Sequence, residues 1–428
     1  MRKRVWASIG LVAAAGLVSA AIAYSWEPAL PEIAEAGPFA PEAIARGEML
    51  ARAGYCGTCH TTDPTRPFAG GRGLETGFGT IFTTNITPDR DTGIGGWSEA
   101  AFDRAMRAGV SRDGSHLFPA FPYDHFSGLS DGDVKALYAY FMTRAAVSAK
   151  NKDDTIPFPL NIRLLQAGWK FLFFHSQRVD SDVAGGIGRG RYLVETLSHC
   201  GACHTPRNSL GAEKADAKFS GASIDGWYAP PLTSANPSPI AWSAEELYAY
   251  LRSGGTPYHG SAGGPMSPVI HGLDALPDSD IEAIAEYIGS LKPQQAKSPE
   301  EAERNALELD RKTSISTISS TGERLYATAC ATCHYNGAAG VNVERPELGL
   351  NTAVFADTPD NLLHVILEGI STQDGLKGVA MPSFANGLSD ADIVSIAQYL
   401  RSTRTPLPPW PDLETKVKNI RASGTKHD

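Results

Sequence analysis

The chain has 428 residues, which is too long for one small domain and fits about three domains of about 100–150 residues each. Apolar residues make up 42% of the sequence and charged residues 20%, as is usual for a folded protein. The 47 acidic residues outnumber the 38 basic ones, and the net charge of −9 argues against nucleic acid as a partner.

The N-terminus carries a targeting or membrane signal. Arg2-Lys3-Arg4 precede an uncharged run from Val5 to Trp26, which is long enough to cross a bilayer. The basic flank predicts that the N-terminus stays in the cytoplasm and that the rest is exported. Residues 1–26 are either a retained anchor or a secretory signal cleaved after Ala21-Ile22-Ala23. We favour the anchor, and with either reading we expect the protein at the inner membrane, on its periplasmic side.

Three segments of the chain follow one plan, which indicates an internal repeat. Each begins with a helical stretch that holds a glycine, continues with Cys-x-x-Cys-His, and closes with an amphipathic helix. Ser130 and Ser389 suit the N-caps of two closing helices, with Asp133 and Asp392 at N3 as in a capping box. The opening stretches are 46–53, 189–197 and 321–328, and the closing helices are expected over 129–140, 276–287 and 388–399.

All six cysteines belong to the three motifs. Two thiols at this spacing, at the end of a helix, can add to the two vinyl groups of one haem, and the adjacent histidine then reaches the iron. A zinc site would need a fourth nearby ligand, and a thioredoxin-like redox pair would need a βαβ setting; the sequence indicates neither. The motifs therefore predict three covalently attached haem c groups. Their residues are Cys56, Cys59 and His60; Cys200, Cys203 and His204; and Cys330, Cys333 and His334.

The fold expected from this repeat is all-α. Gly- and Pro-rich stretches lie between the terminal helices and show little strand alternation, so each segment has little apolar core without a buried haem. We predict three tandem class I cytochrome c domains behind an N-terminal transmembrane anchor. The expected boundaries are 40–146, 183–292 and 315–405 for the domains, 147–182 and 293–314 for the linkers, and 406–428 for a C-terminal tail.

A methionine sulfur is expected as the sixth iron ligand. Met266 and Met381 lie shortly before the closing helices, where such a ligand belongs, and gap filling in a core is the alternative role for each. The first segment has Phe121 at this place. Its candidates are therefore Met106, His125 and His116, beside an open coordination position.

The repeat favours Met106 among these candidates. The stretch 106–109 aligns with 251–254 and with 366–369, so that Leu251 and Ile366 are expected to line the distal side of their haems. Only the segment that lacks the usual ligand has a sulfur at this position.

With these motifs, the chain resembles the three-haem cytochrome c subunit of bacterial membrane-bound dehydrogenases, from about residue 40 to 405. That group includes the subunits of quinoprotein alcohol and flavin gluconate dehydrogenases. The stretches 118–126, 157–163 and 226–232 make it more similar to the cytochrome subunits of molybdenum hydroxylases, which act on aldehydes, nicotinate or isoquinoline. The alcohol dehydrogenase type has methionine at the Phe121 position, and this chain departs from it there.

The resemblance implies an electron-transfer subunit rather than an enzyme. Electrons would enter from a dehydrogenase with molybdopterin and iron–sulfur centres, pass through the three haems, and leave to ubiquinone or a terminal oxidase of the respiratory chain. Gly185–Gly190 is not a dinucleotide-binding fingerprint, because it opens a helix without a βαβ unit. The rival hypothesis is a peroxidase-like haem enzyme with an open first haem, and a further alternative is the cytochrome subunit of a quinoprotein alcohol or flavin gluconate dehydrogenase.

Overall fold

The computed structural model describes residues 26–177, 185–291, 298–312, 320–334 and 342–424. The chain forms two compact units, Met1–Ser181 and Asp182–Asp428. The first unit contains one Cys-x-x-Cys-His motif and the second unit contains two. We call these the first, second and third sites, in chain order.

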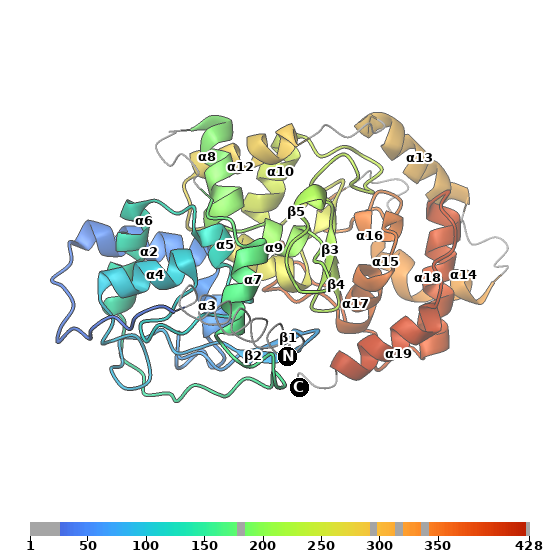
Figure 1. Ribbon diagram of the computed structural model, residues 1–428. Coiled ribbons are helices and arrows are strands. Elements are labelled where there is room, and N and C mark those ends of the chain that lie inside the picture. Colours follow the sequence, from blue (N-terminus) through green and yellow to red (C-terminus); the bar gives the residue numbers. More distant parts are fainter. Residues whose placement is uncertain (1–25, 178–184, 292–297, 313–319, 335–341, 425–428) are drawn as a thin grey trace, which may run out of the picture. The chain divides into compact units, whose positions relative to one another are not determined.

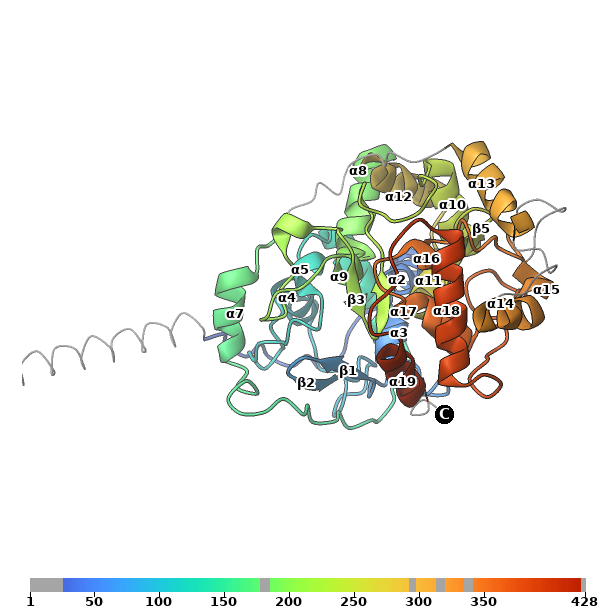
Figure 2. The same cartoon turned by 90° about the vertical axis from the view of Figure 1, so that its right-hand side faces the viewer.

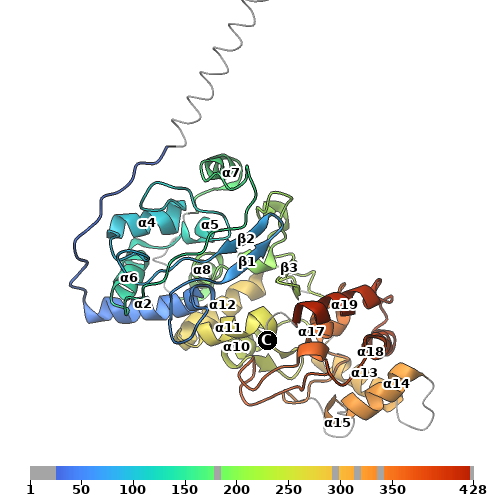
Figure 3. The same ribbon diagram turned by 90° about the horizontal axis from the view of Figure 1, so that it is seen from below.

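The first unit is a set of helices with one β-hairpin (Figure 1). Its apolar interior lies between α2, α4 and α6, where Phe102 and Tyr138 pack with their ring centroids 5.7 Å apart. Strands β1 and β2 pair antiparallel, with Gly73 opposite Phe82, and lie side by side in Figure 3. The elements are α2 (Pro41–Ala53), α3 (Cys56–His60), β1 (Gly73–Thr76), β2 (Gly79–Phe82), α4 (Glu99–Ala108), α5 (Tyr123–Phe126), α6 (Asp131–Met142) and α7 (Leu165–Phe173).

The second unit begins with the elements of the second site. Strands β3 and β4 form a hairpin with Ala222 opposite Ala229, and β5 and β6 form another with Gly255 opposite Ser261. The elements are α8 (Gly186–Tyr192), the π-helix η1 (Leu193–Leu197), α9 (Gly201–His204), the 3-10 helix η2 (Ala215–Ala217), β3 (Ala222–Ile224), β4 (Trp227–Ala229), α10 (Ala244–Ser253), β5 (Gly255–Thr256), β6 (Gly260–Ser261), the 3-10 helix η3 (Gly264–Met266), α11 (Ser267–Leu273) and α12 (Asp278–Ser290).

The elements of the third site complete the second unit, and the last helix of the chain belongs to their core. Leu413, Val417 and Ile420 of α19 are buried in one apolar cluster with residues of α17 and α18, which Figure 2 shows beside α19. The elements are α13 (Pro299–Lys312), α14 (Thr321–Leu325), the π-helix η4 (Tyr326–Cys330), α15 (Ala331–His334), α16 (Thr352–Phe355), α17 (Asp360–Glu368), α18 (Asp390–Arg404) and α19 (Leu413–Gly424).

Each opening helix crosses its closing helix at a glycine. A Cβ atom built on Gly190 would lie 2.5 Å from the carbonyl carbon of Ala283 and 2.7 Å from the Cβ of Tyr287. The same atom on Gly47 would lie 2.6 Å from the Cβ of Tyr140, and on Gly322 it would lie 2.8 Å from the Cβ of Tyr399. Because side-chain carbons essentially never approach within 3.0 Å, only glycine lets these backbones pack so closely. This crossing confirms that the three segments repeat one local structure.

In two of these crossings an ion pair joins the opening helix to the closing helix. Arg46 Nε donates to Asp133 at 2.8 Å, and Arg189 Nε donates to Asp280 at 2.9 Å. In the third segment Thr321 occupies the arginine position, and the carboxylate of Asp392 instead accepts from the backbone N–H of its own N-cap, Ser389. The capping box predicted for Ser389 is therefore confirmed. The N-cap at Ser130 is also confirmed, since its Oγ accepts from the Asp133 N–H at 3.1 Å.

The helix before each closing segment ends at an equivalent glycine. Helices α4, α10 and α17 are followed by Gly109, Gly254 and Gly369, whose φ angles are 61°, 86° and 79°. These positive angles favour glycine and stop each helix at the same point of the repeat. Three residues before these glycines lie Met106, Leu251 and Ile366, and all three side chains are buried. The sequence alignment of these stretches is thus confirmed by the helix ends.

The predicted fold class is wrong. The fold is not all-α, because the described residues form three two-stranded antiparallel sheets beside the helices. Their strands have only two to four residues, too short for an alternation of apolar and polar residues to reveal them. An N-terminal transmembrane anchor is not shown either: residues 1–25 lie outside the described residues, and no helix among the described ones has both the length and the apolar character needed to cross a membrane.

Candidate haem-binding sites

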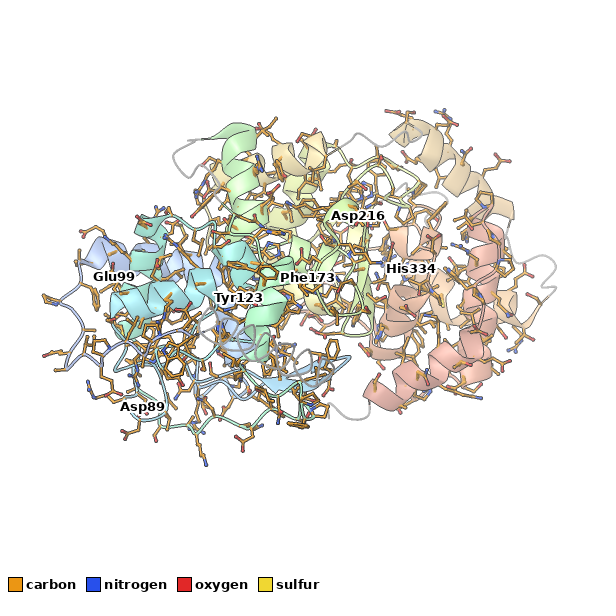
Figure 4. All side chains as sticks on the ribbon, in the orientation of Figure 1. Asp89, Glu99, Tyr123, Phe173, Asp216 and His334 are labelled. Atoms are coloured by element: carbon orange, nitrogen blue, oxygen red, sulfur yellow. The ribbon has the colours of Figure 1, made fainter. Side chains whose placement is uncertain are left out.

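The histidine that follows each cysteine pair is held by a backbone carbonyl. His60 Nδ1 lies 2.7 Å from the Thr84 carbonyl oxygen, and His204 Nδ1 lies 2.6 Å from that of Pro230. His334, labelled in Figure 4, places Nδ1 3.1 Å from the carbonyl oxygen of Pro346. A carbonyl only accepts hydrogen bonds, so the proton sits on Nδ1 and the lone pair on Nε2. This is the tautomer and the ring orientation that a metal ligand requires.

Burial keeps the site residues neutral. Desolvation lowers the pKa of His60 and of His204 below the usual value for histidine, so that both rings keep a lone pair at neutral pH. Burial likewise raises the pKa of Cys56 and of Cys200 to about 12, and that of Cys330 to about 11. The first cysteine of each pair is therefore a neutral thiol at neutral pH, and all six cysteines are reduced, as thioether formation with a vinyl group requires.

These observations fit covalent haem. Each site combines two thiols of one helical turn with a histidine whose Nδ1 faces a backbone carbonyl, and this donor set is that of a c-type haem. In the described part of the chain the second-site motif ends in α9 and the third-site motif in α15, as predicted for cysteines at the end of a helix.

The candidate sixth ligands lie on different elements. Met266 ends η3 and is half-buried, and Met381 is half-buried and pairs with Ile370 through two backbone hydrogen bonds of 2.9 Å. In the first unit Met106 lies in α4 and is 7% exposed, whereas His125 lies in α5 and is 2% exposed. Their roles as ligands stay predictions.

His116 is engaged by a lysine that sequence reasoning did not single out. Lys170 of α7 is buried, and its Nζ lies 2.6 Å from the Ala108 carbonyl oxygen, 2.7 Å from that of Gly109 and 3.0 Å from His116 Nδ1. The ammonium also lies 4.9 Å from the centre of the Tyr123 ring, which Figure 4 labels. An ammonium group donates only, so His116 Nδ1 accepts and its Nε2 carries the proton. Lysine in an apolar run gives no sequence signal for this contact.

The sequence analysis also did not identify the carbonyl groups that hold the histidines, although the sequence contains a weak pattern at two of them. Pro230 begins the stretch Pro230-Pro231-Leu232, and Pro346 begins Pro346-Glu347-Leu348. A Pro-x-Leu stretch therefore follows two of the three motifs. The first site has Thr84-Asn85-Ile86 instead, which only the structure identifies as equivalent.

Comparisons with known proteins agree with these sites. Residues 187–292 match the family model described as Cytochrome c, and residues 319–400 match the one described as Cytochrome C oxidase, cbb3-type, subunit III. Over 93% of its length the chain is 42% identical to a subunit of the nicotinate dehydrogenase of Pseudomonas putida, and it covers 34% of that longer protein. It is 38% identical to the gluconate 2-dehydrogenase cytochrome c subunit of Pantoea cypripedii, with 84% of this chain and 85% of that one covered. It is 33% identical to the cytochrome c subunit of the quinone-dependent alcohol dehydrogenase of Gluconobacter oxydans, with 89% and 82% covered.

The repeated helix crossing, the Cys-x-x-Cys-His sites and the cytochrome c match together define a c-type cytochrome with covalently bound haem. Within this class, the chain belongs to the family of cytochrome c subunits of dehydrogenases. These relatives are named as cytochrome c subunits of dehydrogenases, and the chain is accordingly an electron-transfer subunit.

Proposed function

We propose that this protein carries three haem c groups, one at each site, and that it takes electrons from a molybdenum hydroxylase. The main support for three haem groups is the hydrogen bond from the histidine Nδ1 to a backbone carbonyl, which recurs at His60, His204 and His334. Haem iron, when bound, supplies one-electron redox chemistry. The chain's own residues bury the group, fix the histidine ring and shield the site from water.

Counting haems per chain tests this proposal. A pyridine haemochrome assay on the purified protein should give three haems, and replacing both cysteines of any one motif by alanine should remove one. The first motif is the informative case, because the two family models match the second and third segments. A Cys56→Ala, Cys59→Ala variant with the same haem content as the wild type would refute the count.

We propose Met106 as the sixth ligand of the first site. The contact with Lys170 leaves His116 Nε2 protonated, which disfavours His116, and Met106 is buried three residues before the helix-ending Gly109. Met106→Leu should produce a high-spin ferric signal and rapid cyanide binding at one haem. Met142→Leu, a half-buried methionine of the same unit, is the matched control and should leave the spectrum unchanged.

Cyanide binding and the spin-state spectrum also distinguish an electron carrier from the rival hypothesis, a haem enzyme with an open first haem. If the wild-type protein already binds cyanide rapidly at one haem, the first site has an open position and the assignment of Met106 fails. A normal low-spin spectrum of the wild type, changed only in Met106→Leu, supports an electron carrier.

The proposed partner is a dehydrogenase with molybdopterin and iron–sulfur centres, and the proposed acceptor is ubiquinone or a terminal oxidase. The support is the 42% identity to a subunit of nicotinate dehydrogenase, and Phe121 in place of the methionine of the alcohol dehydrogenase type. The basic flank and apolar run of residues 1–26 support a place on the periplasmic side of the inner membrane. Mass spectrometry of proteins that co-purify with the chain tests the partner. Recovery of a flavin or quinoprotein dehydrogenase would replace this proposal by its alternative.

A further inference from the structure

One short segment of the second unit contacts both the second haem-binding site and helix α17 of the third segment. It runs from Trp227 in β4 to Pro230, and it includes the carbonyl of Pro230 that accepts from His204 Nδ1 at 2.6 Å. The ring that is the proposed iron ligand of the second site is thus held by this segment.

Trp227 also lies against the loop that carries the proposed sixth ligand of the second site. A Cβ atom built on Gly264 would lie 2.6 Å from two carbons of the Trp227 indole ring. The indole therefore packs directly on the backbone two residues before Met266. Gly264 has a φ angle of 51°, which also favours glycine at this position.

The indole ring also contacts a helix of the third segment. Trp227 stacks on His364 of α17, with ring centroids 4.6 Å apart and planes 16° from parallel. His364 is 5% exposed and lies in α17, the helix that also carries Ile366, which the repeat places on the distal side of the third haem. Residues two apart on a helix face different sides, so α17 presents His364 to Trp227 and Ile366 to the apolar interior of the third segment. His364 Nδ1 lies 2.7 Å from Glu368 Oε1, which fixes the imidazole ring.

A pair of hydrogen bonds holds this stack together. Asn361 Oδ1 accepts from the Tyr228 N–H at 2.8 Å, and Asn361 Nδ2 donates to the Tyr228 carbonyl oxygen at 2.8 Å. The backbone of β4 is therefore fixed to α17 one residue after Trp227. The stack has a defined geometry rather than being a loose surface contact.

We propose that Trp227 and His364 form the contact through which the second and third haem sites exchange electrons. Electron tunnelling is faster through atoms in van der Waals contact than across gaps, and the stacked rings provide such contact between the segment that holds His204 and helix α17 of the third site. One electron leaves the reduced second site and reduces the oxidised third site; no bond forms or breaks, neither ring is itself oxidised, and no co-reactant is needed. This inference rests on the proposed function, because it requires haem at both sites.

The test measures electron exchange in the full-length haem-loaded protein. Rapid photoreduction followed by absorbance at the haem bands gives the rate at which an electron redistributes between the second and third haems, and spectroelectrochemistry gives their potentials. Trp227→Leu should lose most of this rate with both potentials close to wild type, and Trp227→Phe should keep an intermediate rate. Asn361→Ala retains both rings but loses the two hydrogen bonds, and it should slow exchange less than Trp227→Leu.

Trp242→Leu is the matched control. Trp242 also stacks on a histidine, His259, with centroids 3.6 Å apart, and Trp242 packs against Tyr250 of α10. Its substitution should leave the exchange rate at the wild-type value. The proposal is overturned if Trp227→Leu exchanges electrons at the wild-type rate, if Trp242→Leu slows exchange equally, or if shifted potentials account for the whole change. A wild-type protein with fewer than three haems would instead refute the proposed function, and the haem count distinguishes the two failures.

Discussion

Replacing Gly190 by alanine tests whether the helix crossing controls the stability of the second site. The new Cβ would lie 2.5 Å from the Ala283 carbonyl carbon and 2.7 Å from the Tyr287 Cβ, where contacts under 3.0 Å are essentially absent. Because backbone atoms of α12 are struck, α8 and α12 must move apart. That movement also strains the hydrogen bonds between Arg189 and Asp280, whose side chains are 15% and 11% exposed.

The expected change in the free energy of unfolding of Gly190→Ala is the sum of two opposing effects. Inserting a carbon into a well-packed contact costs about 1–3 kcal/mol, and the rigid backbone of α12 favours the upper end. Alanine gains up to about 1 kcal/mol over glycine inside a helix. The free energy of unfolding should therefore fall by about 1–2 kcal/mol.

Gly289→Ala is the matched control. Gly289 lies in α12 and is exposed, and its nearest neighbour would be the Ala244 Cβ at 4.0 Å, an ordinary contact. This variant should gain about 0.5–1 kcal/mol, since only the helix preference changes. Urea unfolding of the haem-loaded protein, followed by circular dichroism, measures both. If Gly190→Ala is as stable as Gly289→Ala, the crossing does not have the tight geometry described.

Two further predictions concern buried polar groups. Burial raises the pKa of Glu195, but hydrogen bonds from Tyr287 and Lys218 lower it further, so that the net pKa lies below the usual 4.5. The carboxylate therefore stabilises the fold above about pH 4.5, and this contribution is lost as the pH falls through the lowered pKa. The free energies of unfolding of the wild type and of Glu195→Gln should differ at neutral pH and converge in acid, and a difference that does not depend on pH would contradict this. Lys170→Met leaves the Ala108 and Gly109 carbonyls without their buried donor and should cost about 1–3 kcal/mol, measured by urea unfolding. The exposed Lys135→Met is its control, and equal stabilities of the two variants would show that the buried contacts do not contribute.

The chemistry of the sites follows from residues that are close in sequence. Two cysteines and a histidine within one helical turn are brought together by the helix itself, so their spacing was enough to predict covalent haem, and the comparisons confirm it. Ser130 and Ser389 were predicted as N-caps for the same reason, because a cap and its N3 partner are three residues apart.

The fold class shows where local patterns gave too little information. The hairpin of Ala222–Ile224 and Trp227–Ala229 has three residues in each strand, so it has almost no periodicity, and the all-α prediction missed it. That hairpin contains the residues that contact His364 and Asn361. A short element of this kind is defined by its partners across the fold rather than by its own sequence.

The sequence alone determined the three cysteine–histidine motifs, the repeat and the capped helices, since each depends on residues within a few positions of one another. Only the tertiary structure decided which carbonyl holds each histidine, that Lys170 engages His116, and that Trp227 lies between the Met266 loop and α17. These contacts join residues tens of positions apart. Such pairs are selected by how the helices pack, and residue spacing along the chain does not encode them.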